Sequence, residues 1–399
     1  MTLIEAPRHA TRDGSDAEAL IKEARQRQRK RHLLVGIVVL MAIIVGGVIY
    51  AIVSRPSARA RPTRTSSPTK TVSVAQSGSY VSPKAPYSLA VTPNGDLLVV
   101  DSGRDQILRR LPSGKFQVLA GDGKRGFAGD GGLAVRAEVY VQNDSGIAVA
   151  RDGTVYFSDT GNGRVREVLS NGIIKTVVGG GTRALGQGSM PALSASINKQ
   201  FILAGLTIGP NGELYVAANA VYRLGSHGIL HWVVGRSVPM PNYCWDCNPG
   251  NQNDFLGAER LAFDGMGDLL VAGGPGWGLY EMTKSGKLLF LENFRGDGFW
   301  GSLAEVPGGT VLLAVRNGFL LFSPSRSIKS VGPSESAIDS ALGKMNKEPR
   351  QNIFIGGDGV AVSKHGDIYV DTNVGNTFTS VSAILELRPN GSVVALWKS

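Results

Sequence analysis

The chain has 399 residues, of which 42% are hydrophobic and 19% charged, so it can bury one or two substantial cores and is not disordered throughout. The net charge of +10 sits mostly near the N-terminus. Residues 1–70 hold 13 Lys and Arg against 5 Asp and Glu, and residues 71–399 hold 29 against 27. A nearly neutral globular part argues against a nucleic-acid-binding domain, and no nucleic-acid partner is expected.

Residues 33–53 form an apolar run of 21 residues without a charge, which is long enough for a helix to cross a hydrocarbon layer of roughly 30 Å. A cleavable signal peptide is the alternative, because Ala58-Arg59-Ala60 offers an A-x-A site. The run exceeds the roughly 7–15 apolar residues of a signal peptide and follows a polar segment of about 30 residues. The sequence therefore predicts an uncleaved single-pass transmembrane helix.

Basic residues on either side of this helix set its predicted orientation. They are denser before it, over residues 22–31, than after it, which places residues 1–32 in the cytoplasm as a short basic tail. Residues 54–80 are rich in Ser, Thr, Pro and Arg and predict a disordered stalk. The remainder, residues 81–399, is then exported from a plasma membrane, and the small residues Ala42 and Gly46 leave homodimerisation through the helix open.

The exported part contains internal repeats. Each repeat has four short apolar segments separated by Gly-containing turns, and the six copies begin at Tyr87, Gly146, Gly205, Arg260, Ser302 and Gly359. Turns such as Asn94-Gly95 and Asp152-Gly153 predict two-residue hairpins with positive φ. A lone four-stranded sheet would leave both faces wet, whereas six sheets in a ring cover one another. The predicted fold is all-β, a six-bladed β-propeller preceded by one transmembrane α-helix.

The second repeat carries a recognisable turn. Residues 121–168 resemble an NHL repeat with its lead-in loop, and the D-T-G-N-x-R turn is matched by Asp159, Thr160, Gly161, Asn162 and Arg164. The resemblance to the NHL-repeat β-propeller family covers residues 84–399, most closely in the first three repeats and the last. It implies a range of roles, from outer sensor domains of bacterial receptor kinases through protein- and RNA-binding modules to a few lyases. Similar six-bladed rings include metal-dependent lactonases.

The repeats are longer than compact blades, and the additional residues fall between the last strand of one blade and the first strand of the next. These insertions cover residues 119–145, 179–204, 235–259 and 332–358. They are expected on the same face as the loops between second and third strands, which makes that face the predicted binding face. The alternative is that they are packing loops. Short patterns such as A-V-R-A-E-V from Ala134 and A-L-S-A-S-I from Ala192 could form helical turns.

Exposed aromatic residues supply the candidate ligand site. They lie in the insertion before the fourth blade and in Gly-rich loops of that region, and comprise Tyr243, Trp245, Trp277, Phe299 and Trp300. Such a cluster predicts binding of a protein, a peptide or an envelope glycan. Cys244 and Cys247 form a C-x-x-C motif, for which a disulfide is preferred over redox chemistry or zinc binding, because neither a βαβ unit nor further ligands accompany it.

Catalysis is the competing hypothesis. Carboxylates near the predicted central channel could collect around calcium, as a metal-dependent hydrolase, lactonase or lyase would require, and they are Asp144, Glu259, Asp264, Glu305 and Asp358. The G-x-G-x-x-G of residues 121–126 is not followed by a helix and does not predict a dinucleotide site. No catalytic residue, metal or cofactor is predicted. The preferred function is a membrane-anchored extracytoplasmic binding or scaffold propeller.

Overall fold

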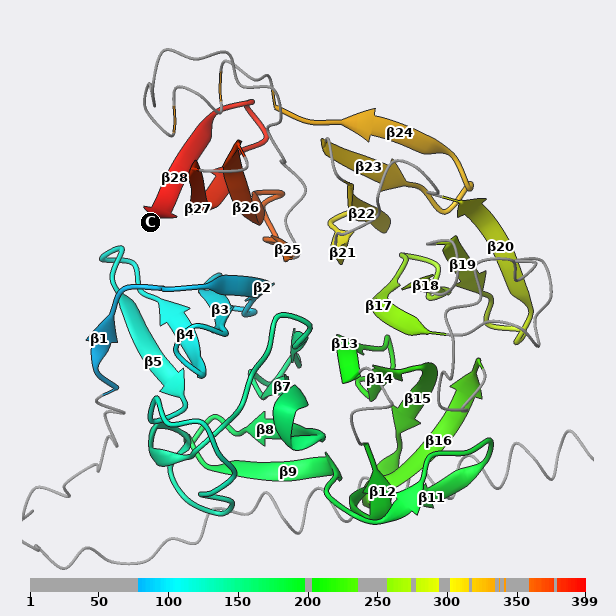
Figure 1. The fold of residues 1–399 in the computed structure, drawn as a ribbon. Helices are drawn as coiled ribbons and strands as arrows, with labels where there is room; N and C mark the ends of the chain where they lie inside the picture. The colour runs from blue at the N-terminus through cyan, green and yellow to red at the C-terminus, as the bar shows by residue number, and fades with distance from the viewer. Residues whose placement is uncertain are drawn as a thin grey trace, which may run out of the picture. The chain divides into compact units, whose positions relative to one another are not determined.

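The computed structural model describes residues 78–197, 203–235, 257–273, 278–293, 302–315, 318–333, 359–376 and 379–399, together with residues 337 and 341. Within the unit Ser73–Ser399, six antiparallel sheets follow one another along the chain, and each contains four consecutive strands (Figure 1). Blades 1 to 3 consist of β2 (Pro86–Val91), β3 (Leu97–Asp101), β4 (Gln106–Arg110) and β5 (Phe116–Ala120); β6 (Ile147–Val149), β7 (Val155–Asp159), β8 (Arg164–Val168) and β9 (Ile174–Gly179); and β13 (Leu203–Ile208), β14 (Leu214–Ala218), β15 (Ala220–Leu224) and β16 (Ile229–Val234). Blades 4 to 6 consist of β17 (Ala258–Phe263), β18 (Leu269–Gly273), β19 (Gly278–Met282) and β20 (Leu288–Asn293); β21 (Leu303–Val306), β22 (Thr310–Val315), β23 (Gly318–Phe322) and β24 (Ile328–Val331); and β25 (Val360–Val362), β26 (Ile368–Asn376), β27 (Thr379–Leu387) and β28 (Val393–Lys398).

The six sheets close into a ring. Each innermost strand contacts the innermost strand of the next blade, in the cyclic order β2, β6, β13, β17, β21, β25 and back to β2 (Figure 1). One apolar cluster lies between each pair of neighbouring blades, including the pair formed by blade 6 and blade 1. The predicted six-bladed propeller is therefore confirmed.

The second strand of each blade shows why repetition is needed. In β3, with the sequence LLVVD, and in β18, with the sequence LLVAG, every residue is buried. Apolar residues on both faces of a strand require cover on both faces, which only a blade on either side supplies. Burying each Leu or Val side chain stabilises the fold by about 1.5–3 kcal/mol, so the ring is held mainly by these contacts between blades.

The turns between first and second strands differ from the predicted two-residue hairpins. The amide of Gly95 donates to the carbonyl of Thr92 over 2.8 Å, and the amide of Thr92 donates to the carbonyl of Asp96 over 2.9 Å. Gly95 has a positive φ of 93°, whereas the φ of Asn94 is negative. The loop is a longer turn that closes on a left-handed glycine, because one such residue is enough to return the chain to the strand direction.

The segments before blades 1 and 3 add outer strands. β1 (Tyr80–Val81) pairs with β5, and β11 (Ser189–Pro191) pairs with β16. A further parallel pair joins β10 (Arg183–Ala184) to β12 (Ala195–Ser196). The insertions also contain the expected helical turns, which are the 3-10 turns η1 (Ala134–Arg136) and η3 (Ala192–Ser194). Two further 3-10 turns lie in loops, η2 (Thr160–Asn162) and η4 (Ser226–Gly228).

The predicted transmembrane span at residues 33–53 lies outside the described residues, as do the basic tail and most of the stalk. In the part of the chain that is described, no helix has the length and apolar character that crossing a membrane needs.

Candidate functional site

Aspartates in the second strands hold the chain where it enters a blade. The carboxylate of Asp101 accepts hydrogen bonds from the amides of Lys84 and Ala85, at 2.8 and 2.9 Å. The carboxylate of Asp371 in β26 accepts one from the amide of Gly359 at 2.6 Å. Each aspartate is buried, so it replaces water as the acceptor for amides that would otherwise lose their partner.

The NHL turn of blade 2 follows the same principle. Asp159 Oδ1 accepts hydrogen bonds from the amide of Tyr140 at 2.7 Å and from the side chain of Asn162 at 2.8 Å. Asn162 also donates to the carbonyl of Gly126 at 2.7 Å, and Arg164 lies over the ring of Phe127 at 3.8 Å. The turn residues picked out from the sequence therefore fasten the lead-in loop, residues 121–139, to blade 2.

A buried arginine that the sequence did not single out completes this anchor. Arg166 in β8 is fully buried, and its guanidinium lies 3.1 Å from Asp159 Oδ2 and 2.7 Å from Asp130 Oδ1. Asp130 also accepts a hydrogen bond from the amide of Thr176 at 3.1 Å. A charged side chain in a strand is expected to face solvent. Arg166 is buried because the loop folds over the strand that carries it.

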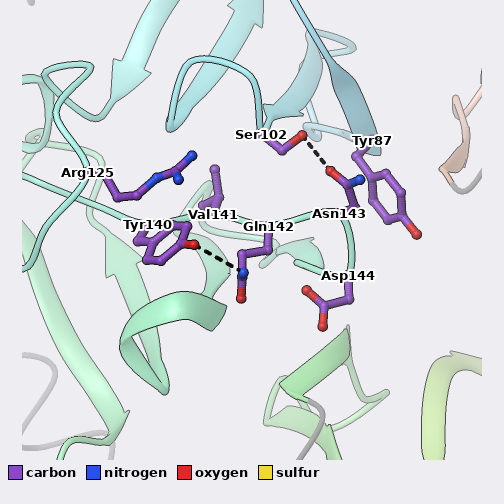
Figure 2. A pocket seen from close by; sticks show the side chains of 8 residues that line it. All are labelled: Tyr87, Ser102, Arg125, Tyr140, Val141, Gln142, Asn143 and Asp144. Carbon is purple, nitrogen blue, oxygen red and sulfur yellow. Dashed lines mark hydrogen bonds between the residues drawn. The ribbon is translucent and has the colours of Figure 1, made fainter. Parts of the chain in front are cut away.

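The anchored loop forms one wall of a pocket of about 420 Å³ between blades 1 and 2 (Figure 2). Its lining comes from β2, the loop between β3 and β4, and the insertion that leads into β6, and consists of Tyr87, Ser102, Arg125, Tyr140, Val141, Gln142, Asn143 and Asp144. Ser102 Oγ donates to Asn143 Oδ1 at 2.8 Å, and Gln142 Nε2 donates to the Tyr140 hydroxyl at 3.3 Å. The pocket thus lies on the insertion-bearing face, defined here as the face formed by the loops between second and third strands and the connections between blades.

The electrostatics of the pocket differ between its two ends, where Figure 2 shows Arg125 and Asp144. Burial raises the pKa of Asp144, while its own backbone amide and the charge of Arg260 act in the opposite direction. Burial also raises the pKa of Glu259 in β17, with Arg260 again opposing the shift and Asp144 adding to it. The two carboxylates therefore share the field of one guanidinium.

The other carboxylates named from the sequence lie elsewhere. Burial is the largest cause that raises the pKa of Glu305 in β21, and Asp264 adds to the shift while Arg151 opposes it. Asp264 Oδ1 is used within its own turn, where it accepts the amides of residues 266 and 268. Asp358 lies outside the described residues, and among those that are described no three His, Cys, Asp or Glu side chains come together as metal ligands would.

The aromatic ligand site predicted from the sequence is not placed by the structure. All five of its members and both cysteines lie outside the described residues, and they are Tyr243, Trp245, Trp277, Phe299, Trp300, Cys244 and Cys247. Of the pocket residues, only Asp144 was a candidate site residue in the sequence. The remaining ones carry no motif, and their polar side chains resemble those of any loop.

The described sheets define a six-bladed β-propeller in which the insertion before the second blade folds over its NHL turn. Residues 112–201, which include that turn, match the family model of the teneurin NHL domain. The predicted NHL repeat is therefore confirmed in this segment, and the described residues form a six-bladed β-propeller.

Several solved propellers resemble the chain at low identity. Virginiamycin B lyase from Staphylococcus aureus is 13% identical, with 79% of this chain and 87% of that chain covered and a TM-score of 0.46. The PQQ-bound aldose sugar dehydrogenase from Streptomyces coelicolor is 17% identical, covering 77% and 96% with a TM-score of 0.44. A gluconolactonase from Xanthomonas campestris is 13% identical, covering 80% and 87% with a TM-score of 0.42.

Proposed function

We propose that the chain is a non-catalytic binding protein that holds a segment of a partner protein in the pocket between blades 1 and 2. The pocket itself carries this proposal. Its wall presents exposed amide side chains at Gln142 and Asn143 beside the ring of Tyr140, on backbone that Asp159 fixes through the Tyr140 amide. Polar groups held on a rigid frame lose little conformational entropy on binding, which favours recognition.

The hydroxyl chemistry of the pocket supports binding over catalysis. Ser102 is the only serine in its lining, and its Oγ lies 2.8 Å from Asn143 Oδ1 and 3.2 Å from the carbonyl of Ala85. Neither an amide oxygen nor a carbonyl oxygen is basic enough to take the proton of a nucleophilic serine. Among the residues that line the pocket, Asp144 is the one carboxylate, so the pair of acids used in acid–base hydrolysis is not assembled there.

In this proposal residues 33–53 anchor the chain in the plasma membrane and the propeller lies on the extracytoplasmic side. The charge-free apolar run and the dense basic residues before it support that orientation. Resistance of the full-length chain to carbonate extraction, together with protease cleavage of the propeller in intact spheroplasts, is the expected behaviour. A propeller protected from external protease would contradict the orientation.

A photo-crosslinking amino acid at position 142 tests the binding site in cells that produce the full-length chain. We expect a discrete protein adduct. Excess unmodified chain should suppress this adduct, whereas excess chain carrying both Gln142→Ala and Asn143→Ala should not. The matched control is the same crosslinker at Ser170, an exposed residue in the groove of the opposite face. Identical adducts at both positions, or adducts that consist of glycan, would refute the protein-binding pocket.

A further inference from the structure

The cationic end of the pocket contains an ion pair. Arg125 Nε lies 3.1 Å from Asp105 Oδ2, and the guanidinium stacks over the ring of Tyr140 at 4.3 Å. An arginine engaged on both sides keeps only part of its surface for a ligand. Arg125 therefore already has an anionic and an aromatic partner within the protein.

The acidic end is not neutralised in the same way. Asp144 Oδ1 is buried and accepts no hydrogen bond from another described residue. The cation that acts on Asp144 is Arg260, and it acts on Glu259 as well. Two carboxylates therefore face one guanidinium at this end of the pocket, so the charges there are not matched one to one.

We propose that the pocket receives a lysine side chain of the partner, with the ammonium group at Asp144 and the methylene stem against the ring of Tyr87. This inference rests on the proposed function and adds the chemistry that the pocket recognises. Figure 2 shows Tyr87 and Asp144 on the same side of the pocket, so the lining supplies both an aromatic ring and a carboxylate at the end where the cation would lie.

Lysine fits this end better than arginine. Asp144 Oδ1 is buried, and a guanidinium fork would need both carboxylate oxygens to bind in its bidentate geometry. A lysine ammonium is a compact charge that satisfies a single oxygen, and its flexible stem can reach a carboxylate set at the end of the pocket.

The test measures binding of the full-length chain to pools of short peptides, blocked at both ends, with random flanks and a fixed central residue. The central residue is lysine, Nε-acetyl-lysine, arginine or glutamate. The lysine pool should bind about tenfold more tightly than the acetyl-lysine pool, the loss that removal of one charge-assisted hydrogen bond produces. Asp144→Asn should lower the affinity for the lysine pool to that for the acetyl-lysine pool. Asp152→Asn, on the opposite face, should leave the affinity for the lysine pool unchanged.

The pH dependence provides a second readout that does not depend on a variant. Since burial raises the pKa of Asp144, the lysine preference should be present at neutral pH and disappear on acidification at a higher pH than an ordinary aspartate would give. A lysine preference that persists in Asp144→Asn, or that does not weaken on acidification, would overturn the inference.

The remaining outcomes separate this inference from the proposed function. Equal binding of the lysine and acetyl-lysine pools, lost in the chain carrying Gln142→Ala and Asn143→Ala, would overturn the lysine assignment and leave the protein-binding pocket intact. Binding to no peptide pool, combined with binding to amino sugars on a glycan array that Asp144→Asn abolishes, would overturn the protein-binding pocket as well.

Discussion

Replacing Arg166 by methionine should strongly destabilise the propeller. The guanidinium and the Asp159 carboxylate are both fully buried and lie 3.1 Å apart. Methionine fills a similar volume but leaves the Asp159 charge inside the protein without a cation. Asp159 would keep hydrogen bonds from the Tyr140 amide and the Asn162 side chain, and both of these donate to Oδ1.

Breaking a buried ion pair by removing one partner costs about 3–5 kcal/mol. Arg166 Nε has no hydrogen-bond partner among the described residues, which places the expected loss in the lower half of that range. At about 2 °C per kcal/mol for a domain of this size, the melting temperature should fall by about 6–8 °C. Asp130 supplies the comparison, because its own side chain is 39% exposed and Asp130→Ala should cost only about 1 kcal/mol.

Thermal and urea unfolding, followed by circular dichroism, measure both variants against the unmodified chain. The double variant Asp159→Asn with Arg166→Met no longer buries an isolated charge, so it should recover part of the loss of Arg166→Met. A loss in Arg166→Met no larger than that in Asp130→Ala would show that Asp159 does not depend on its buried cation, and the reasoning would fail.

Three further changes test other parts of the fold. Burial raises the pKa of Glu259 above 4.5. The stability that Glu259 contributes is therefore present below pH 4.5 and is lost as the pH rises through the raised pKa. Glu259→Gln should have a higher melting temperature than the unmodified chain at neutral pH, and the difference between the two melting temperatures should narrow toward pH 4.5. A Cβ on Gly163, which has a φ of 61°, would collide with a backbone carbonyl, whereas Gly153, with a φ of 84°, has open space around it. Gly153→Ala should cost about 1 kcal/mol of stability. Gly163→Ala should lower the melting temperature several-fold more than Gly153→Ala does. Asp101→Ala leaves two entering amides without their acceptor and should lower the urea midpoint by the equivalent of about 1–3 kcal/mol, and an unchanged midpoint would show that water replaces the carboxylate.

The blade repeat could be predicted because each of its strands is recognisable from a short local stretch of sequence. Runs such as Leu97–Asp101 and Thr310–Val315 are short, apolar and bounded by turn residues, and they appear as second strands in the ring. The outer strands β1 and β11 could not be predicted in the same way. Tyr80–Val81 and Ser189–Pro191 become strands only because the open edges of β5 and β16 provide hydrogen-bonding partners.

The pocket could not be predicted because its parts meet only after the ring forms. Ser102 and Asn143 are separated by 41 positions and lie in different loops, yet they share a hydrogen bond. Arg166 was missed for a related reason, since a charged residue in a strand becomes internal only when the loop from Gly126 to Asp130 covers it. The turn residues Asp159 and Asn162 were recognised, and their geometry identifies them as anchors of that loop.

The anchors are distributed unevenly around the ring, and this explains why the pocket lies where it does. Asp371, Asp101 and Asp159 belong to blades 6, 1 and 2, which are neighbours because the ring closes between blades 6 and 1. The described second strands of blades 3 to 5, β14, β18 and β22, contain no aspartate. A binding wall needs backbone that does not shift when a ligand arrives, and buried carboxylate–amide bonds provide it. The pocket between blades 1 and 2 therefore lies in the part of the ring where buried aspartates of the second strands hold the entering chain.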